Sequence, residues 1–238
     1  MRIYLVRHGQ SELNVNREVK FTTPDHAVPL TEKGHQQADG AAEFLVKHLM
    51  DESMKQSDTM RFRIWSSPYR RARETTEHLR QKFSEDPFFS EAPLANTRRF
   101  RYDVREHIML CEQQFGLFDG VPDDQLELEF PREHKHYDLC EKHNGRFWAR
   151  FPLGESRFDV ACRIHQAFGT FHRDNDKHGI NTIIVVCHGV TLRAFVMMWL
   201  HKSPEWFEEE PNPGNCAVRL LQDGEDKGYI FKGFPKNG

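Results

Sequence analysis

The fold of this chain is constrained most by two short apolar segments that end in the same way. The β-rich segment Ile3–Val6 runs into Arg7-His8-Gly9, and Thr182–Cys187, the clearest buried strand of the sequence, runs into His188-Gly189. Short apolar runs that stop at turn-forming residues predict buried strands. Ligands of open α/β sheets collect at the carboxyl ends of the strands. The two histidines are therefore expected to share one crevice.

Helical patterns separate the predicted strands along the chain. Thr31 is expected to cap a helix whose apolar positions lie between residues 38 and 49, and a second strand, Phe62–Trp65, precedes another helix. The later helical patterns are Arg70–Phe83, Phe158–Phe171 and Val190–Leu200. The expected edge strands are Ala217–Leu221 and Tyr229–Phe231. This alternation predicts an α/β fold with a mostly parallel central sheet that is flanked by helices on both faces.

Residues 86–154 break the regular alternation with prolines, aromatic residues and charges. We expect one domain over residues 1–238, with 86–154 inserted as a cap or lid. Four basic residues of this segment are candidates to contact a second anionic group of a ligand: Arg132, Lys135, Arg146 and Arg150. The stretch 146–150 also contains Phe147 and Trp148, and a helix packed through its aromatic residues is the favoured interpretation.

Composition excludes several classes of function. The 33 basic and 36 acidic side chains give a formal net charge of -3, so neither nucleic-acid binding nor attraction to an anionic membrane is expected. Five scattered cysteines without a Cys-x-x-Cys pair indicate free thiols and a reducing compartment. The apolar stretches are too short for a signal peptide or a membrane span. A cytoplasmic protein with a small-molecule partner is predicted, and its oligomeric state stays open.

Arginines beside the predicted crevice indicate an anionic ligand. Arg7 adjoins His8, and Arg70 and Arg71 lie at the start of a predicted helix, where backbone N–H groups also favour anions. A guanidinium matches the geometry of phosphate oxygens, although a carboxylate would suit it too. The helix arginines taken alone are slightly better explained as a solvated basic face.

An ordered set of motifs resembles the histidine phosphatase superfamily, in its phosphoglycerate-mutase-like branch. The motifs are Arg7-His8-Gly9 with Ser11 and Asn14, Ser66-Ser67-Pro68 with Arg71-Ala72, Glu112 before Gly116, Gly154-Glu155-Ser156, and His188-Gly189. They run in the family's order from residue 3 to about residue 220, so the resemblance covers nearly the whole chain.

This resemblance implies a role for each matched residue. His8 would be the nucleophile that forms a transient phosphohistidine, and Glu112 would protonate the leaving alkoxide and then activate water. Other residues would bind the phosphoryl group: Arg7, Arg71, His188, Asn14, Gln10 and Gly189. Nearby arginines are expected to keep His8 neutral, whereas His188 is expected to stay protonated against the phosphate. No metal and no cofactor is required.

The expected reaction is hydrolysis of a phosphate monoester. The family's mutases carry adjacent arginines after the glutamate, whereas this chain has Leu117-Phe118-Asp119-Gly120 and an acidic stretch, which favours a phosphatase over a mutase. A mutase with the same intermediate remains the alternative. Two further rivals are a metal-dependent hydrolase, suggested by His134, His136 and His143, and a binding module without turnover. The physiological substrate stays open.

Overall fold

The centre of the molecule is a mixed β-sheet. The computed structural model describes residues 1–54, 60–91, 100–122 and 124–234. Within these residues seven strands pair in the order β3-β4-β2-β5-β1-β6-β7. In chain order the strands are β1 (Arg2–Arg7), β2 (Met60–Ser66), β3 (Phe89–Glu91), β4 (Phe100–Glu106), β5 (Thr182–Cys187), β6 (Val218–Gln222) and β7 (Glu225–Phe231). All neighbours are parallel except β6 and β7, which are antiparallel at one edge, so the predicted mostly parallel α/β sheet is confirmed.

The register of the central strands aligns their carboxyl ends. Strand β1 pairs with β5 so that Arg7 lies beside Cys187, and β2 pairs with β5 so that Ser66 lies beside Val186. These strands are buried on both faces, which explains why β1 and β5 read as nearly continuous apolar runs. The residues that follow β1, β2 and β5 therefore meet at the carboxyl ends of the central strands.

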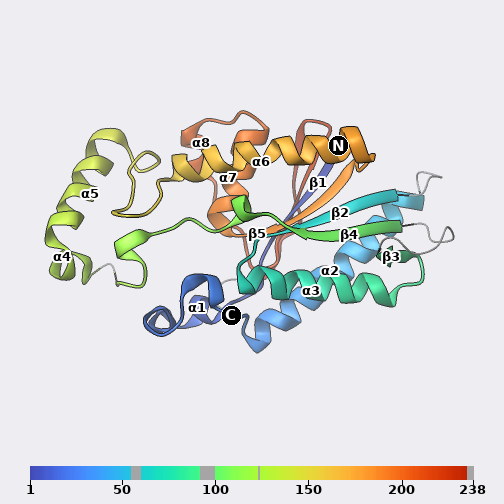
Figure 1. The fold of residues 1–238 in the computed structure, drawn as a ribbon, viewed down its shortest axis with the longest axis horizontal. Helices are drawn as coiled ribbons and strands as arrows, with labels where there is room; N and C mark the ends of the chain where they lie inside the picture. Colours follow the sequence, from blue (N-terminus) through green and yellow to red (C-terminus); the bar gives the residue numbers. More distant parts are fainter. Residues whose placement is uncertain (55–59, 92–99, 123, 235–238) are drawn as a thin grey trace.

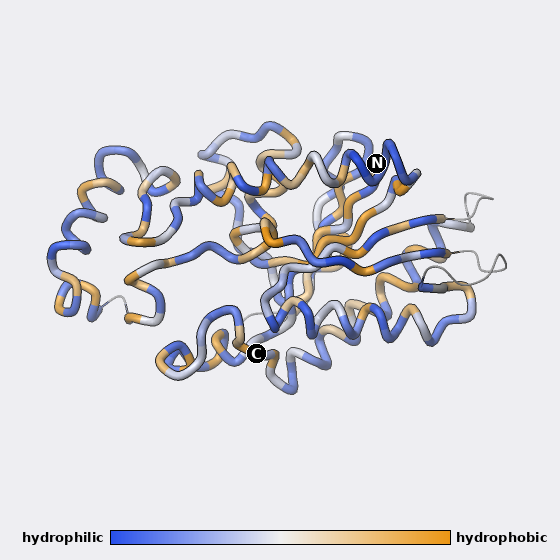
Figure 2. Tube along the Cα trace, in the orientation of Figure 1, coloured by the Kyte–Doolittle hydropathy of each residue, from blue (hydrophilic) through white to orange (hydrophobic). Residues whose placement is uncertain are grey.

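Helices cover both faces of the sheet, as predicted (Figure 1). Helices α2 (Glu32–Met54) and α3 (Arg70–Glu85) pack on one face, and α6 (Arg157–His178) and α7 (Gly189–Trp199) pack on the other. Alternate residues of β1 supply the two cores: Tyr4 and Val6 face α2 and α3, whereas Ile3 and Leu5 face α6 and α7. Figure 2 shows the resulting concentration of hydrophobic residues along the central strands.

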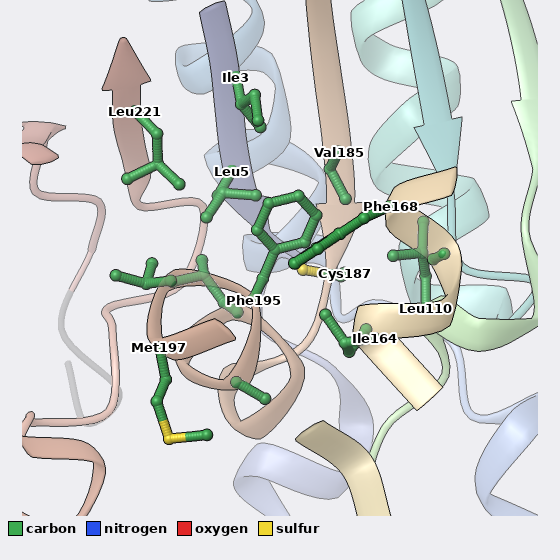
Figure 3. Close-up of a cluster of buried hydrophobic side chains, with 14 of the residues drawn as sticks. Ile3, Leu5, Leu110, Ile164, Phe168, Val185, Cys187, Phe195, Met197 and Leu221 are labelled. Carbon is green, nitrogen blue, oxygen red and sulfur yellow. The ribbon is translucent and has the colours of Figure 1, made fainter. Parts of the chain in front are cut away.

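An aromatic cluster fixes α6 and α7 against the sheet. The ring centroids of Phe168 and Phe195 lie 5.0 Å apart, and both rings lie close to Leu5 and Val185 (Figure 3). Full burial of each such side chain contributes about 1.5–3 kcal/mol to the free energy of folding. The carboxyl end of β5 and the start of α7 are therefore held by a close-packed layer.

The remaining helical segments are short and lie mostly at the ends of the sheet. They are α1 (Glu12–Val15), η1 (Arg17–Phe21), η2 (Asp25–Ala27), η3 (Ile108–Leu110), η4 (Gly116–Phe118), α4 (Leu126–Glu129), α5 (Pro131–Asn144) and α8 (Pro204–Glu209). Helices α4 and α5 stand apart from the sheet at one end of the molecule (Figure 1). Among the described residues, no helix is long and apolar enough to cross a membrane.

The segment predicted as an insertion, 86–154, is partly sheet. Strands β3 and β4 fall inside this range: β4 pairs with β2 and β3 pairs with β4, so the part that leaves the sheet begins after β4. The buried Phe100 and Tyr102 alternate with Arg101 and Asp103, and the charged residues obscured this pattern in the sequence. The cap over the core stays a proposal for the residues after β4.

The expected helix at 146–150 does not form, but the favoured packing is observed. These residues make a turn, in which the buried Phe147 ring lies 5.5 Å from the ring of Phe207. Arg146 pairs with Glu141, and Arg150 pairs with a carboxylate of α6. Aromatic burial rather than helical hydrogen bonding therefore holds this stretch.

Candidate active site

The two histidines predicted to share a crevice lie side by side. His8 follows β1 and His188 follows β5, and their ring centroids are 5.1 Å apart. Only 3% of His8 and 0% of His188 is exposed. The parallel register of β1 and β5 brings them together, as expected for residues at neighbouring carboxyl ends.

The hydrogen bonding of His8 leaves one ring nitrogen available as a nucleophile. Nδ1 lies 2.7 Å from the carbonyl oxygen of Gly9, which can only accept, so Nδ1 carries the proton. In a neutral ring Nε2 then holds a lone pair. Burial, followed by the charges of Arg71 and Arg7, holds the pKa of His8 well below its usual range, which agrees with the expected neutral ring.

His188 is held by the turn that follows β2. Its Nε2 lies 2.8 Å from the hydroxyl oxygen of Ser67, and its Nδ1 is buried with no hydrogen-bond partner among the described residues. Burial and then the charge of Arg71 hold the pKa of His188 well below its usual range. The ligand-free site therefore favours a neutral His188, and its protonation against a bound phosphate stays a prediction.

Arg7 adds a buried positive charge to the crevice. Its Nη1 donates to the carbonyl oxygen of Pro213 at 2.6 Å, while its Nε is buried without a partner in the described part of the chain. Burial lowers the pKa of Arg7, and the negative charge of Glu112 opposes this shift. A buried cation with an unused donor is suited to an anionic ligand.

Arg71, near the start of α3, is buried and already paired. Its guanidinium donates to the carbonyl oxygen of Asp25 at 2.6 Å and to the two carboxylate oxygens of Asp25 at 3.0 and 3.3 Å. The guanidinium carbon also lies 5.0 Å from the centre of the Tyr69 ring. Asp25 therefore fixes the direction of this cation in the ligand-free protein.

Glu112 lies in the loop after β4 and is partly buried. Its carboxylate accepts a hydrogen bond from the backbone N–H of Gln113 at 3.0 Å and lies 3.4 Å from the Thr191 hydroxyl, which donates to the carbonyl oxygen of Cys111 at 2.6 Å. Arg163 of α6 holds this loop by donating to the carbonyl oxygen of Glu112 at 3.1 Å, and Arg163 is itself paired with Glu155 at 2.8 Å. Glu155 of the Gly154-Glu155-Ser156 motif thus helps to hold the loop of Glu112 through Arg163.

The other predicted ligand-binding residues have structural partners. The Gln10 side-chain oxygen accepts from the Thr31 hydroxyl at 2.9 Å, and the exposed Asn14 accepts from the backbone N–H of Ser11 at 3.0 Å. Gly189 begins α7, where any side chain would collide with Asn212. These contacts shape the loop and the helix start, and a role in binding phosphate stays a prediction for all three residues.

Sequence reasoning missed several residues that position the site. Asp25 accepts hydrogen bonds from Arg71, and the carbonyl oxygen of Pro213 accepts one from Arg7. The Thr75 hydroxyl accepts from the backbone N–H of Gly9 at 3.1 Å, and the Thr191 hydroxyl contacts the carboxylate of Glu112. Each contact spans at least 46 residues of sequence, so no local pattern signals it.

The described residues contain no group of three or more histidine, cysteine, aspartate or glutamate side chains able to hold a metal ion. His134, from the proposed histidine cluster, pairs instead with Asp138 on α5. All five cysteines are free thiols.

Comparisons with known proteins show the family of this chain. Residues 3–232 match the model of the histidine phosphatase superfamily (branch 1). The chain is 35% identical over 236 residues to phosphoglycerate mutase-like protein AT74 of Arabidopsis thaliana, covering 96% of this chain and 66% of that relative, so about a third of that relative lies outside the match. It is 27% identical to the broad-range acid phosphatase DET1 of Saccharomyces cerevisiae, over 97% of this chain and 88% of that protein.

Solved structures share the fold. A mycobacterial glucosyl-3-phosphoglycerate phosphatase in complex with inorganic phosphate aligns with a TM-score of 0.65 at 20% identity, over 100% of this chain and 99% of that one. The α-ribazole phosphatase from Shigella flexneri aligns with a TM-score of 0.64 at 17% identity, over 98% of this chain and 96% of that one. Since the family model covers nearly the whole chain, this protein belongs to the histidine phosphatase superfamily, branch 1.

Proposed function

We propose that this protein hydrolyses phosphate monoesters through a phosphohistidine on His8, with Glu112 as general acid and base. The observation that carries the proposal is the state of His8: its Nδ1–H is used by the carbonyl oxygen of Gly9, and burial with Arg7 and Arg71 lowers its pKa. A neutral ring with a free Nε2 is the form that attacks phosphorus. A similarity to a named acid phosphatase supports hydrolysis as the class of reaction.

In the first step Nε2 of His8 attacks phosphorus, and the bond from phosphorus to the ester oxygen breaks. The leaving alkoxide takes a proton from Glu112, which becomes a carboxylate. Arg7, Arg71 and the unpartnered Nδ1 of His188 supply positive charge and a donor for the phosphoryl oxygens. Such positioning and electrostatic stabilisation carry most of the catalysis of phosphoryl transfer.

In the second step water attacks phosphorus while Glu112 takes its proton. The phosphorus–nitrogen bond breaks, inorganic phosphate leaves, and Nε2 of His8 regains its lone pair. The site then returns to its starting protonation without a metal or a cofactor.

A mutase that uses the same intermediate is the second candidate, because the name of the relative AT74 contains phosphoglycerate mutase. A mutase returns the phosphoryl group to a bound intermediate, whereas a phosphatase transfers it to water. The segment Leu117–Gly120, which lacks the adjacent arginines expected of a mutase, favours water as the acceptor.

The proposed partner is a small phosphorylated molecule. The formal net charge of -3 and the local placement of the arginines argue against nucleic acid and membranes as partners. The five free thiols support a reducing, cytoplasmic location.

A phosphate-ester screen tests this proposal. The unaltered protein, His8→Ala and the matched surface variant His143→Ala would each be offered aryl and sugar phosphates without a bisphosphate primer. We expect inorganic phosphate from the unaltered protein and from His143→Ala, and none above background from His8→Ala. Phosphate release that persists in His8→Ala, or rapid phosphoglycerate interconversion without phosphate release, would contradict the proposal.

A further inference from the structure

A cavity lies between the segment that follows His8 and the segment that follows Glu112. It has a volume of about 260 Å³. One side is formed by α1 and η1, which follow the His8 loop, and the other by the segment that follows Glu112. Its lining residues are Leu13, Arg17, Lys20, Phe115, Phe118, Gly120 and Val121.

Chain connectivity keeps this cavity close to the reacting groups. Phe115 is three residues after Glu112, so their Cα atoms are at most about 11 Å apart, and Leu13 is five residues after His8, at most about 18 Å away. The cavity thus lies within reach of a substrate whose phosphoryl group occupies the crevice between His8 and Arg71. The leaving group is the part of such a substrate that would extend toward Phe115.

One wall of the cavity is aromatic and fixed. The ring of Phe115 lies 5.2 Å from that of Phe151, and the buried Phe118 lies 6.0 Å from Phe151. Leu117, which lies between Phe115 and Phe118 in the sequence, donates its backbone N–H to the carbonyl oxygen of Pro152 at 2.9 Å. A preformed apolar wall of this kind suits an aromatic or other apolar portion of a ligand.

The other wall carries two cations in different states. Lys20 forms an ion pair with Asp119, and its ammonium group lies 5.4 Å from the centre of the Phe115 ring. Arg17 is exposed, and its side chain forms no ion pair or hydrogen bond with the described residues. An uncompensated guanidinium beside an apolar wall favours a ligand that combines an apolar part with an anion.

We infer that this cavity, defined by Arg17 and Phe115, binds the leaving group of the substrate. The preferred substrate is a phosphate monoester whose leaving group has an apolar ring and a second anionic group. The ring packs against Phe115, and the second anion pairs with Arg17. This inference rests on the proposed phosphatase function and adds to it a substrate class.

A matched pair of esters tests the inference. Phenyl phosphate and 4-carboxyphenyl phosphate differ by one carboxylate, and their kcat/KM values would be compared in the unaltered protein and in Arg17→Ala. Since an exposed ion pair contributes up to about 1 kcal/mol, the carboxylate should raise kcat/KM about fivefold in the unaltered protein. Arg17→Ala should abolish this preference and leave kcat/KM for phenyl phosphate unchanged.

Two further variants sharpen the test. Asp119→Asn removes the carboxylate that neutralises Lys20, so the preference for the carboxylated ester should increase. Arg146→Ala removes an exposed arginine outside the cavity and should leave the preference intact. An equal effect of Arg17→Ala on both esters, or a loss of preference in Arg146→Ala instead, would overturn the inference.

Affinity measurements with phosphonates test this inference independently of the proposed function. Benzylphosphonate and 4-carboxybenzylphosphonate are not hydrolysed, and their affinities can be measured by titration calorimetry. If the carboxylated compound binds more tightly and this difference depends on Arg17, the assignment of the cavity as a binding site is supported. If in addition no ester is hydrolysed, only the phosphatase function is refuted. Equal affinities of the two phosphonates would refute the cavity while leaving phosphate release intact.

Discussion

Replacement of Gly9 by alanine is expected to slow catalysis through a displacement of His8. A Cβ atom at Gly9 would lie 2.5 Å from the carbonyl oxygen of Gly34, at the start of α2. Ordinary contact requires about 3.4 Å, so the loop must move by about 0.9 Å. The carbonyl oxygen of Gly9 accepts a hydrogen bond from Nδ1–H of His8, and the backbone N–H of Gly9 donates to the Thr75 hydroxyl. The displacement therefore reaches the nucleophile directly.

The size of the effect follows from this geometry. A misplacement of about 1 Å in a catalytic group costs about 10²-fold in rate, and overpacking costs about 1–3 kcal/mol of stability. The assay is kcat for an aryl phosphate, together with the thermal unfolding midpoint. Gly34→Ala, whose Cβ would collide with the carbonyl oxygen of Gln10 in the same loop, should act similarly.

Gly169→Ala is the matched control. Gly169 lies within α6 and has no atom near the position of an added Cβ, so alanine should stabilise the protein by about 0.5–1 kcal/mol and leave kcat unchanged. If Gly9→Ala turned over at the rate of the unaltered protein, the close packing of this loop on α2 would not position His8.

Three other perturbations have defined outcomes. Glu112→Gln should lower kcat by about two to four orders of magnitude with nearly unchanged affinity for inorganic phosphate, and an unchanged kcat would remove Glu112 from the mechanism. Burial and Arg71 lower the pKa of His8 and His188, so below about pH 6.5 the unfolded chain binds more protons than the native one. Chemical denaturation should therefore show that the free energy of unfolding decreases below this pH, by at most about 1.4 kcal/mol per pH unit for each ring. The same pH dependence in a double His→Gln variant would argue against this origin. Asp25→Ala should release Arg71, tightening inorganic phosphate binding in calorimetry while lowering kcat about tenfold, and equal kcat values would show that Asp25 does not orient the guanidinium.

The sequence allowed prediction of the elements whose signals are local. Strands β1 and β5 are buried on both faces, so their apolar runs were unambiguous, and the histidines that follow them could be placed at one edge of the sheet. Strand β4 has one polar face, and its charged residues concealed the pattern. The turn at 146–150 escaped prediction because aromatic packing, rather than helical hydrogen bonding, determines it.

Contacts between distant segments could not be predicted. Arg71 was recognised as a candidate ligand for phosphate, but its pairing with Asp25 depends on how the loop before α2 folds against α3. Glu112 has no local signal of function and was found only through its place in the ordered motifs. The neutral state favoured for His188 arises from its complete burial, which depends on the tertiary fold and has no local signal in the sequence.

Direct detection of the phosphorylated intermediate tests the central claim most directly. The protein would be mixed with an excess of an aryl phosphate and quenched in alkali, which preserves phosphohistidine, before peptide mass spectrometry. The account predicts one phosphoryl group on His8, which accumulates to a higher level in Glu112→Gln if that variant slows hydrolysis of the intermediate more than its formation. Turnover with an unmodified His8, or a phosphoryl group on a different residue, would contradict it.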